Sequence, residues 1–335
     1  MNDEWVRRQQ LKMANGYRVN RFGGPEVMVW EALALGDLAP QAVRVRVGAS
    51  GINFAEVRMR AGDYSGQELP FIMGMEVAGT IEQVGSEVVD FQEGDRVFGR
   101  VRGAHAEVVD CDPSHLMPLP HNLSFEQGAA IPVGWLTAWH ALYTVGGMKA
   151  GDRVLIEAVG GSVGSAALAL AKQAGCWTLG TASRDDKLAH ATASGCDAVV
   201  NYTQTSVSER VADLTKGEGM DIGLMTIGDA TADQLIDAMG MDGRVIMFGS
   251  TGGRDITFNL KIGILNIQLL SMSISTSPAF MTQTMPDFRQ HALPLFASGE
   301  LTPWVDTVLP MSELRRAHEM VDERKHFGKV ILVNE

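Results

Sequence analysis

A glycine-rich stretch in the middle of the chain has the residue types and spacing of a phosphate-binding turn. The segment EAVGGSVGSAALALAKQAG follows an apolar run and opens a helix-like run, and Ala158, Gly161 and Gly164 form an AxxGxxG pattern. Gly161 has no Cβ to keep a pyrophosphate away from the backbone, and Gly164 lets a helix pack closely on a strand. The N–H groups around Ser162 and Val163 would then face the phosphates of a dinucleotide. Glycines also end strands for structural reasons, but the flanking strand and helix favour a dinucleotide site.

The next strand ends in residues that could select between the two nicotinamide dinucleotides. An NAD site carries Asp or Glu about 20 residues after the glycine turn, where it binds the ribose 2′-hydroxyl. Here the sequence reads GTASRDDK, in which Ser183 offers a hydroxyl and Arg184 and Lys187 offer cations for a 2′-phosphate. NADPH is therefore favoured over NADH. The alternative is that Arg184 and Lys187 are solvated first-turn residues, with Asp185 and Asp186 as ordinary helix-start carboxylates.

Two rhythms along the chain indicate the elements that must position these residues. From about residue 17 to 119, short β-like runs such as AVRVRVGAS are broken by Gly, Pro and Asp, which indicates a β-rich half. From about 125 to 249, strand, Gly-rich turn and helix alternate, which predicts an α/β domain with a doubly wound parallel sheet. The chain ends with SELRRAHEMVDERK as a helix and HFGKVILVNE as a strand, and we expect this tail to rejoin the first domain.

The predicted domains are therefore 1–124 together with 266–335, and 125–265 between them. These boundaries depend on the change of pattern alone, because the sequence has no internal repeat and no low-complexity linker. Residues 1–12 precede the first strand-like run and are interpreted as a leader or an alternative start.

Composition and charge exclude several classes of protein. A chain of 335 residues that is 45% hydrophobic and 20% charged suits two compact domains. Its net charge of −12, without a Lys/Arg run, argues against nucleic acid or an anionic membrane as partner. No apolar stretch reaches the roughly 18 residues of a membrane span, and the N-terminus lacks the apolar core of a signal peptide. The cysteines Cys111, Cys176 and Cys196 are scattered singly, which predicts a reducing, cytoplasmic location.

The order of several motifs resembles the medium-chain dehydrogenase/reductase superfamily. These motifs are GINFAEVRMRAGDYSG, MGMEVAGTIEQVGSEV, FQEGDRVFG, GAHAEVV, IPVGWLTAWHAL, the glycine turn and the terminal FGKVIL, and they span nearly the whole chain. Within the superfamily the sequence is most similar to the zinc-independent quinone oxidoreductase and zeta-crystallin branch, and to the enoyl reductase domains of polyketide synthases. The resemblance implies a Rossmann dinucleotide-binding domain inserted into a GroES-like substrate domain.

The resemblance also implies that this chain lacks the catalytic metal of zinc alcohol dehydrogenases. Those enzymes have a Cys where this chain has Asn53, and a His where it has Met75 before Glu76. Thioether sulfur and carboxamide are poor zinc ligands, and the four-Cys structural lobe is absent as well. We therefore expect no metal, and we interpret Met75 as core packing and Glu76 as a buried carboxylate paired within the fold.

Without a metal to polarise a carbonyl, the natural reaction is hydride transfer from NADPH to an already electrophilic acceptor, a quinone or the C=C bond of an α,β-unsaturated carbonyl. By the resemblance, Asn53 is similar to a family Asn beside the nicotinamide that binds the cofactor or polarises the substrate oxygen. Tyr64 is similar to a tyrosine proposed as a proton donor in some enoyl reductases. The alternatives are that Asn53 caps a turn and that Tyr64 is only an aromatic lid.

The resemblance implies further cofactor contacts in both parts of the chain. These residues are Thr137, Phe248, Gly249 and Ser250 on the nicotinamide side, Tyr202 at the adenosine end, and Lys329. For Thr137 the competing interpretation is a helix-interior threonine that bonds its own backbone. The sequence departs from the family at two positions, where Met225 replaces an Asp and Ser162 replaces a Gly. The histidines His105, His115, His121 and His140 are isolated in sequence and are interpreted as structural or surface residues.

Three functions remain open at this stage. The first is a zinc-independent NADPH-dependent reductase of quinones or α,β-unsaturated carbonyls. The second is a 2-enoyl thioester reductase that acts on acyl carrier or coenzyme A substrates, and the third is an NADPH-binding protein without turnover. We also expect a homodimer, because FNLKIGILNIQLLSMSIS places an apolar run near a sheet edge.

Overall fold

The computed structural model describes residues 12–64, 66–252 and 255–334, and the chain divides into two compact units. One unit contains the described residues up to Val133 together with those from Thr302 onward, and the other is Gly134–Leu301. The interpretation of residues 1–12 as a leader falls almost wholly outside the described residues. The first boundary lies close to the predicted one, whereas the second lies well beyond residue 265.

The second unit is built on a six-stranded parallel sheet with the order β11-β10-β9-β12-β13-β14. Its strands are β9 (Arg153–Ile156), β10 (Trp177–Ala182), β11 (Ala198–Asn201), β12 (Met220–Met225), β13 (Met239–Met247) and β14 (Gln268–Ser271). The strand order reverses between β9 and β12, so this is a doubly wound sheet whose ligands are expected at the carboxyl ends of those strands.

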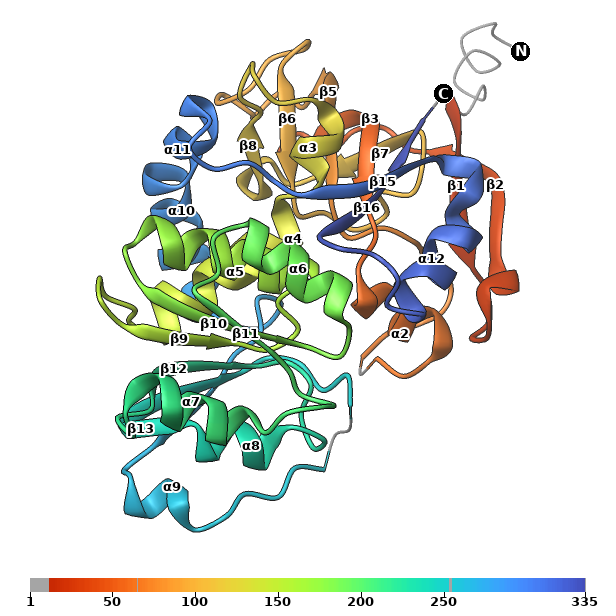
Figure 1. The fold of residues 1–335 in the computed structure, drawn as a ribbon. Helices are drawn as coiled ribbons and strands as arrows, with labels where there is room; N and C mark the ends of the chain where they lie inside the picture. Colours follow the sequence, from red (N-terminus) through yellow and green to blue (C-terminus); the bar gives the residue numbers. More distant parts are fainter. Residues whose placement is uncertain (1–11, 65, 253–254, 335) are drawn as a thin grey trace, which may run out of the picture. The chain divides into compact units, whose positions relative to one another are not determined.

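Helices cover both faces of this sheet. Figure 1 shows α5 and α6 on one face and α7 and α8 on the other. The bounds are α5 (Ser162–Gln173), α6 (Asp185–Ala193), α7 (Val207–Thr215), α8 (Ala232–Asp237) and α9 (Lys261–Ile264). On one face, α7 and α8 enclose a core that includes Leu155, Leu179 and Val245, and α7 adds Val207 and Val211 to it. The predicted rhythm of strands and helices is present, because each apolar run forms a buried strand and each amphipathic run covers it.

Aromatic packing explains why the second unit extends to residue 301. The segments concerned are α4 (Pro132–Trp139), the π-helical turns His140–Val145 and Phe280–Thr284, α10 (Met285–His291) and α11 (Leu293–Ser298). The Trp135 and Phe296 rings meet edge to face with centroids 4.8 Å apart. His140 Nδ1 lies 2.6 Å from Thr284 Oγ1. These tertiary contacts tie residues 280–298 to the dinucleotide unit, although nothing local in their sequence indicates it.

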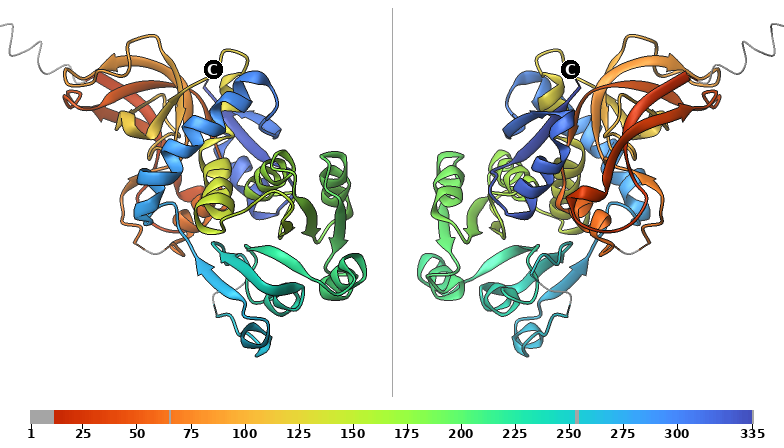
Figure 2. Two further views of the ribbon diagram at one scale, coloured as in Figure 1. Left: turned by 90° about the vertical axis from the view of Figure 1, so that its left-hand side faces the viewer. Right: turned by 90° about the vertical axis from the view of Figure 1, so that its right-hand side faces the viewer.

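The first unit is β-rich, as the sequence predicts. A main sheet runs β15-β16-β3-β5-β6-β8 with β7 paired to β3, and a smaller sheet runs β2-β1-β4. The strands are β1 (Lys12–Val19), β2 (Met28–Leu35), β3 (Val43–Gly51), β4 (Phe71–Ile72), β5 (Val77–Val84), β6 (Arg96–Gly99), β7 (Val108–Cys111), β8 (Leu116–Pro118), β15 (Val305–Pro310) and β16 (Lys329–Val333). The red β1–β2 hairpin is visible from two sides in Figure 2.

Among the described residues, three helices and three 3-10 turns complete the first unit. They are α2 (Phe54–Ala61), α3 (Phe125–Ala129), α12 (Leu314–Asp322), η1 (Pro25–Val27), η2 (Pro113–His115) and η5 (Met311–Glu313). The terminal strand β16 pairs with β3, so the tail rejoins the first unit as expected. The predicted fold class, a doubly wound Rossmann sheet inserted into a GroES-like β-rich domain, is confirmed. Within the described ranges, no helix is long and apolar enough to cross a lipid bilayer.

Candidate functional site

The glycine turn lies where the sequence places it, at the carboxyl end of β9. Ala158 has a φ of 49°, and the chain then enters α5 with Gly161 as the residue before the helix. A Cβ on Gly164 would lie 2.4 Å from the carbonyl oxygen of Ala158, so only glycine fits there. A Cβ on Gly161 would meet only that oxygen, at 3.3 Å. The first turn of α5 therefore presents unbonded N–H groups, among them those of Ser162 and Val163, in an open cradle that suits phosphate.

The residues predicted to bind a 2′-phosphate lie at the carboxyl end of β10. Ser183 and Arg184 follow the strand directly, and the stem of Lys187 lies against Gly160 of the glycine turn, since a Cβ there would be 2.9 Å from Lys187 Cβ. The Arg184 guanidinium donates to both oxygens of Asp186, at 3.0 and 2.5 Å, and this hydrogen bonding lowers the pKa of the Asp186 carboxyl. The cations are thus in place, but Arg184 is held by an acidic neighbour.

The other predicted cofactor residues of this unit also gather at the carboxyl edge. Tyr202 follows β11, and its N–H donates to the carbonyl of Ala182 at the end of β10. Phe248 to Ser250 follow β13, and a Cβ on Gly249 would lie 2.6 Å from the Thr226 carbonyl oxygen. Thr137 lies on α4, which contacts the start of α5 where Gly134 meets the Ser162 side chain. The structure therefore brings these residues together around one edge of the sheet.

One buried carboxylate at this edge escaped the sequence reasoning. Glu157 is the residue between β9 and the glycine turn, and it is 2% exposed. Its Oε2 accepts from the N–H groups of Thr226 and Ile227, at 2.8 and 2.9 Å. Its Oε1 accepts from the Thr231 hydroxyl at 2.5 Å. Burial raises the pKa of Glu157 in spite of these donors. A lone acidic residue that ends an apolar strand before a glycine turn was the available sequence signal.

A buried polar network in the first unit surrounds Asn53. The Asn53 side-chain NH₂ donates to Glu56 Oε2 at 3.0 Å and to Glu76 Oε1 at 2.7 Å. Its carbonyl oxygen accepts from Lys329 Nζ at 2.7 Å, and Lys329 also forms an ion pair with Glu76. The second oxygen of Glu76 accepts from the N–H of Val133 at 2.7 Å. The expectation that Glu76 is paired within the fold therefore agrees with this geometry.

The network constrains what Asn53 can do chemically. Two carboxylates face its nitrogen and an ammonium faces its oxygen, which fixes the orientation of the amide. Both amide hydrogens are used inside the protein, so Asn53 could donate to a substrate oxygen only by releasing a buried carboxylate. Its oxygen keeps one lone pair, and Lys329 keeps one of its three N–H donors. This geometry favours Asn53 as a hydrogen-bond acceptor rather than as a polarising donor.

A second layer of buried groups supports Asn53 through Glu56. The N–H of Asn53 donates to Glu56 Oε2 at 2.9 Å, which caps the start of α2. The other Glu56 oxygen lies 2.9 Å from His105 Nε2, and His105 Nδ1 lies 2.6 Å from the Ser50 hydroxyl. Burial alone would raise the pKa of Glu56, but the His105 ring and the Asn53 amide outweigh it, and the pKa is lowered. Glu56 and Ser50 were not foreseen, and His105 was interpreted as a structural or surface residue.

Tyr64 lies apart from this buried network. It follows α2 in the loop that begins at Gly62, and 37% of it is exposed. The Arg100 guanidinium interacts with Tyr64, and burial lowers the pKa of Arg100. An exposed phenol near a cation fits either the proton donor or the aromatic lid, so the catalytic role of Tyr64 stays a prediction.

Asn53 and Met75, which stand where zinc alcohol dehydrogenases have metal ligands, do not fit a zinc ion. The amide of Asn53 is bonded to two carboxylates and an ammonium, and the ammonium of Lys329 would repel a dication. Met75 would offer only a thioether, which is a poor ligand for Zn²⁺. In the part of the chain that the structure describes, no three His, Cys, Asp or Glu side chains are grouped to hold a metal.

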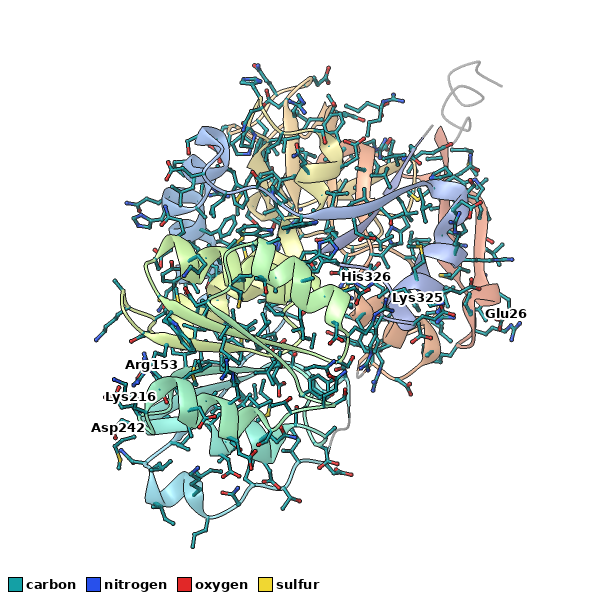
Figure 3. The ribbon with its side chains drawn as sticks, viewed as in Figure 1. Glu26, Arg153, Lys216, Asp242, Lys325 and His326 are labelled. Carbon is teal, nitrogen blue, oxygen red and sulfur yellow. The ribbon has the colours of Figure 1, made fainter. Side chains whose placement is uncertain are left out.

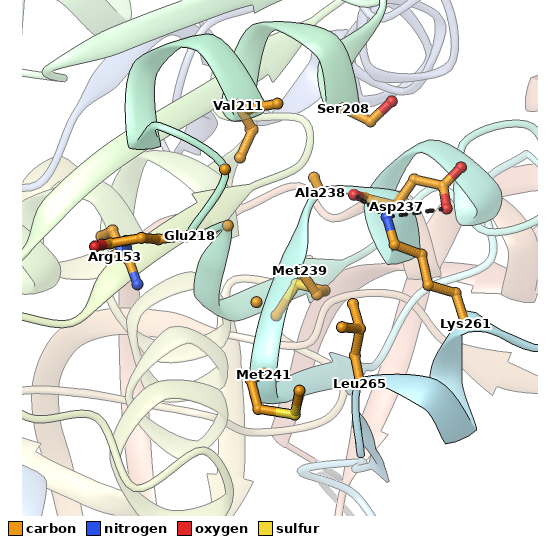
Figure 4. Close-up of a pocket in the computed structure, with 14 residues that line it drawn as sticks. Arg153, Ser208, Val211, Glu218, Asp237, Ala238, Met239, Met241, Lys261 and Leu265 are labelled. Atoms are coloured by element: carbon orange, nitrogen blue, oxygen red, sulfur yellow. Dashed lines mark hydrogen bonds and ion pairs between the residues drawn. The ribbon is translucent and has the colours of Figure 1, made fainter.

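A cavity of about 570 Å³ lies at the opposite edge of the dinucleotide sheet from the glycine turn. Figure 4 shows its apolar floor of Val211, Met239 and Leu265, with Arg153 and Glu218 paired at 2.6 Å on its rim. Figure 3 labels Arg153 at this end of the strands, with Lys216 and Asp242 near it. This cavity contains none of the predicted cofactor residues, so its size does not identify it as the site.

Two family models match the chain. The alcohol dehydrogenase GroES-like domain matches residues 39–121, and the zinc-binding dehydrogenase domain matches residues 162–298. The first match lies in the β-rich unit and the second in the dinucleotide unit.

Similar proteins match nearly the whole chain. The human quinone oxidoreductase is 31% identical over an alignment of 334 positions, which covers 96% of this chain and 98% of the relative. A quinone oxidoreductase of Pseudomonas aeruginosa is 30% identical, with 96% and 100% covered. Among solved structures, the quinone oxidoreductase of Pseudomonas syringae pv. Tomato DC3000 superimposes with a TM-score of 0.87 at 30% identity, covering 96% and 99%. The Escherichia coli quinone oxidoreductase complexed with NADPH has a TM-score of 0.85 at 29% identity, covering 96% and 100%.

Proposed function

Because the chain belongs to the quinone oxidoreductase family of the medium-chain dehydrogenase/reductase superfamily, and is an oxidoreductase of that type, we propose that it reduces quinones or α,β-unsaturated carbonyls with NADPH. The balanced reaction takes one hydride from NADPH and one proton, and it yields NADP⁺ and the hydroquinone or the saturated carbonyl. Bound NADPH would supply the hydride at its nicotinamide ring. The proposal assigns the cofactor to the unit Gly134–Leu301 and the acceptor to the other unit.

The observation that carries this proposal is the cradle at the glycine turn. Gly164 has no room for a side chain, while the space over Gly161 is open except for one carbonyl oxygen. The turn is thus tightly packed at Gly164 and open at Gly161, and it lies at the N-terminus of a helix of twelve residues. This arrangement suits a pyrophosphate. Arg184 and Lys187 beside it would bind the 2′-phosphate, which favours NADPH over NADH.

The remaining predicted residues have separate roles in this proposal. Thr137, Tyr202 and Phe248 to Ser250 would line the path of the cofactor along the carboxyl edge of the sheet. In the first unit, Asn53 would accept a hydrogen bond and Lys329 would donate one, each with the one bonding position that the network leaves unused. Tyr64, whose phenol is exposed, would supply the proton.

The test is a titration of the purified protein with NADPH and with NADH, followed by a panel of acceptors. Naphthoquinone, cyclohexenone and crotonyl coenzyme A would each be added while the nicotinamide absorbance is followed. We expect tighter binding of NADPH and its consumption with naphthoquinone or cyclohexenone. Consumption with crotonyl coenzyme A alone would instead identify a 2-enoyl thioester reductase, and NADPH binding without any consumption would identify a binding protein.

We further propose that the protein is a homodimer in the cytoplasm. Strand β14 has a paired neighbour only on its β13 side among the described strands, and Figure 2 places it at the outer end of the sheet. Leu260, just before α9, and Ile264, at its end, are exposed and lie a few residues before β14 in the sequence. An unpaired strand edge with apolar side chains near it would invite association with a second copy. Three cysteines without disulfides suit a reducing compartment. Sedimentation that gives a monomer at micromolar concentration would refute the dimer.

A further inference from the structure

We propose that Glu157 is a positioning residue that fixes the loop after β12 and, through it, the loop after β13 that carries the predicted nicotinamide-side residues. We call the hydrogen bonds that Glu157 accepts from this loop the clamp. The inference rests on the proposed function, since the clamp would serve to place the nicotinamide end of NADPH. Glu157 itself would touch neither the cofactor nor the acceptor.

Burying the Glu157 carboxylate costs free energy that its hydrogen-bond donors must offset. An ionised carboxylate that is 2% exposed carries a large desolvation penalty unless donors surround it. Glu157 receives three donors, the N–H groups of Thr226 and Ile227 and the hydroxyl of Thr231. All three belong to the single loop that follows β12. The carboxylate therefore acts on this loop alone, across the junction between the neighbouring strands β9 and β12.

The loop after β12 also forms hydrogen bonds with the loop after β13. The carbonyl oxygen of Thr226 accepts from the N–H of Thr251 at 3.3 Å, and that of Ile227 accepts from the N–H of Gly252 at 2.7 Å. Gly249 packs so closely on Thr226 that a Cβ would lie 2.6 Å from its carbonyl oxygen. The backbone of residues 226–227 is thus held on one side by Glu157, and it holds the loop after β13 on the other.

Glu157 lies at the carboxyl end of the sheet, beside the predicted cofactor site. Glu157 directly precedes the glycine turn, where a negative charge opposes the binding of an anionic cofactor. The contacts of its carboxyl group account for an acidic residue at that point. They tie together the ends of β9, β12 and β13, which are the strands on either side of the reversal in strand order.

The experiment compares Glu157→Leu with Glu157→Gln. The leucine keeps the volume and leaves two buried N–H groups without an acceptor, whereas the glutamine oxygen can still accept from both of them. A third variant adds Met225→Asp to Glu157→Leu, because residues 225 and 157 each follow directly on Leu224–Ile156, the last pair that joins β12 to β9, and an aspartate at 225 can accept from the N–H two residues on. Glu218→Leu, an exposed carboxylate at the opposite edge of the same sheet, is the matched control.

Binding of two ligands tests whether Glu157 acts on the nicotinamide end of the cofactor. NADPH and 2′-phospho-ADP-ribose, which lacks the nicotinamide, are titrated against each variant. We expect Glu157→Leu to weaken NADPH about tenfold and to leave the fragment unchanged, with Glu157→Gln and the double variant restoring NADPH binding. Equal weakening of both ligands, or no weakening of either, would overturn the proposal.

Hydrogen exchange at the amides of Thr226 and Ile227 in the cofactor-free protein tests the clamp separately. We expect faster exchange in Glu157→Leu and recovery in Glu157→Gln, whereas unchanged exchange would overturn the clamp itself. If the wild-type protein bound no NADPH but the exchange changed as expected, the proposed function would fail while the clamp stood.

Discussion

We expect the buried ring of His318 to make the stability of the first unit depend on pH. The ring lies on α12, is fully buried, and has no hydrogen-bond partner for either nitrogen among the described residues. Burial lowers the pKa of His318 from 6.5 to about 3, although the charge of Glu56 opposes the change. The unfolded chain therefore binds a proton near pH 6.5 that the folded chain refuses until about pH 3. Stability is full above pH 6.5 and is lost progressively as the pH falls through this window.

The size of the effect follows from the two pKa values. At about 1.4 kcal/mol per pKa unit, the loss between pH 7 and pH 5 is about 2 kcal/mol, and it approaches about 5 kcal/mol near pH 3. His318→Leu removes the titrating group and two unpaired polar atoms, so we expect a variant that is at least as stable at pH 7 and loses about 2 kcal/mol less by pH 5.

Urea unfolding at pH 7 and pH 5, followed by tryptophan fluorescence, measures the difference. The same substitution at His121, which is exposed, is the control and should leave the pH dependence unchanged. Parallel pH dependence in the wild-type protein and His318→Leu would refute the reasoning, because it would mean that His318 titrates alike in both states.

Three further substitutions test other parts of the account. Arg184→Ala should raise the dissociation constant of NADPH about tenfold and leave that of NADH unchanged; equal shifts would contradict a 2′-phosphate role. Gly164→Ala would place a Cβ 2.4 Å from a carbonyl oxygen and should abolish NADPH binding by titration, whereas Gly36→Ala, with open space around it, should bind normally. Glu76→Gln should lower the free energy of unfolding by about 3–5 kcal/mol, since it removes the anion beside buried Lys329; an unchanged urea midpoint would argue against this ion pair.

The local features of the fold and site could be predicted from the sequence. The glycine turn was foreseen because each glycine answers a constraint set by its own neighbours, such as the carbonyl oxygen of Ala158 against Gly164. The strands and helices of the dinucleotide unit follow from apolar periodicity, and α5 begins at Ser162 where the pattern changes from strand to helix. The cations after β10 were found for the same reason, because they adjoin a strand end.

The features that were missed depend on contacts between distant residues. Ser50, Glu56 and His105 meet only because β3, α2 and the segment before β7 fold together, and no spacing in the sequence indicates it. The compact dinucleotide unit extends to Leu301, beyond the predicted residue 265, because rings such as Phe296 pack against α4 across more than a hundred residues. The pairing of Arg184 with Asp186 is local, but a sequence cannot decide whether a neighbouring carboxylate or a ligand holds the cation.

The most direct test of the central claim is the ratio of kcat/KM for NADPH to kcat/KM for NADH, measured with naphthoquinone as acceptor and the wild-type protein. The account predicts turnover and a ratio of at least about ten, because a charge-assisted pair to the 2′-phosphate is worth roughly that factor. Absence of turnover with either cofactor, or a preference for NADH, would contradict it.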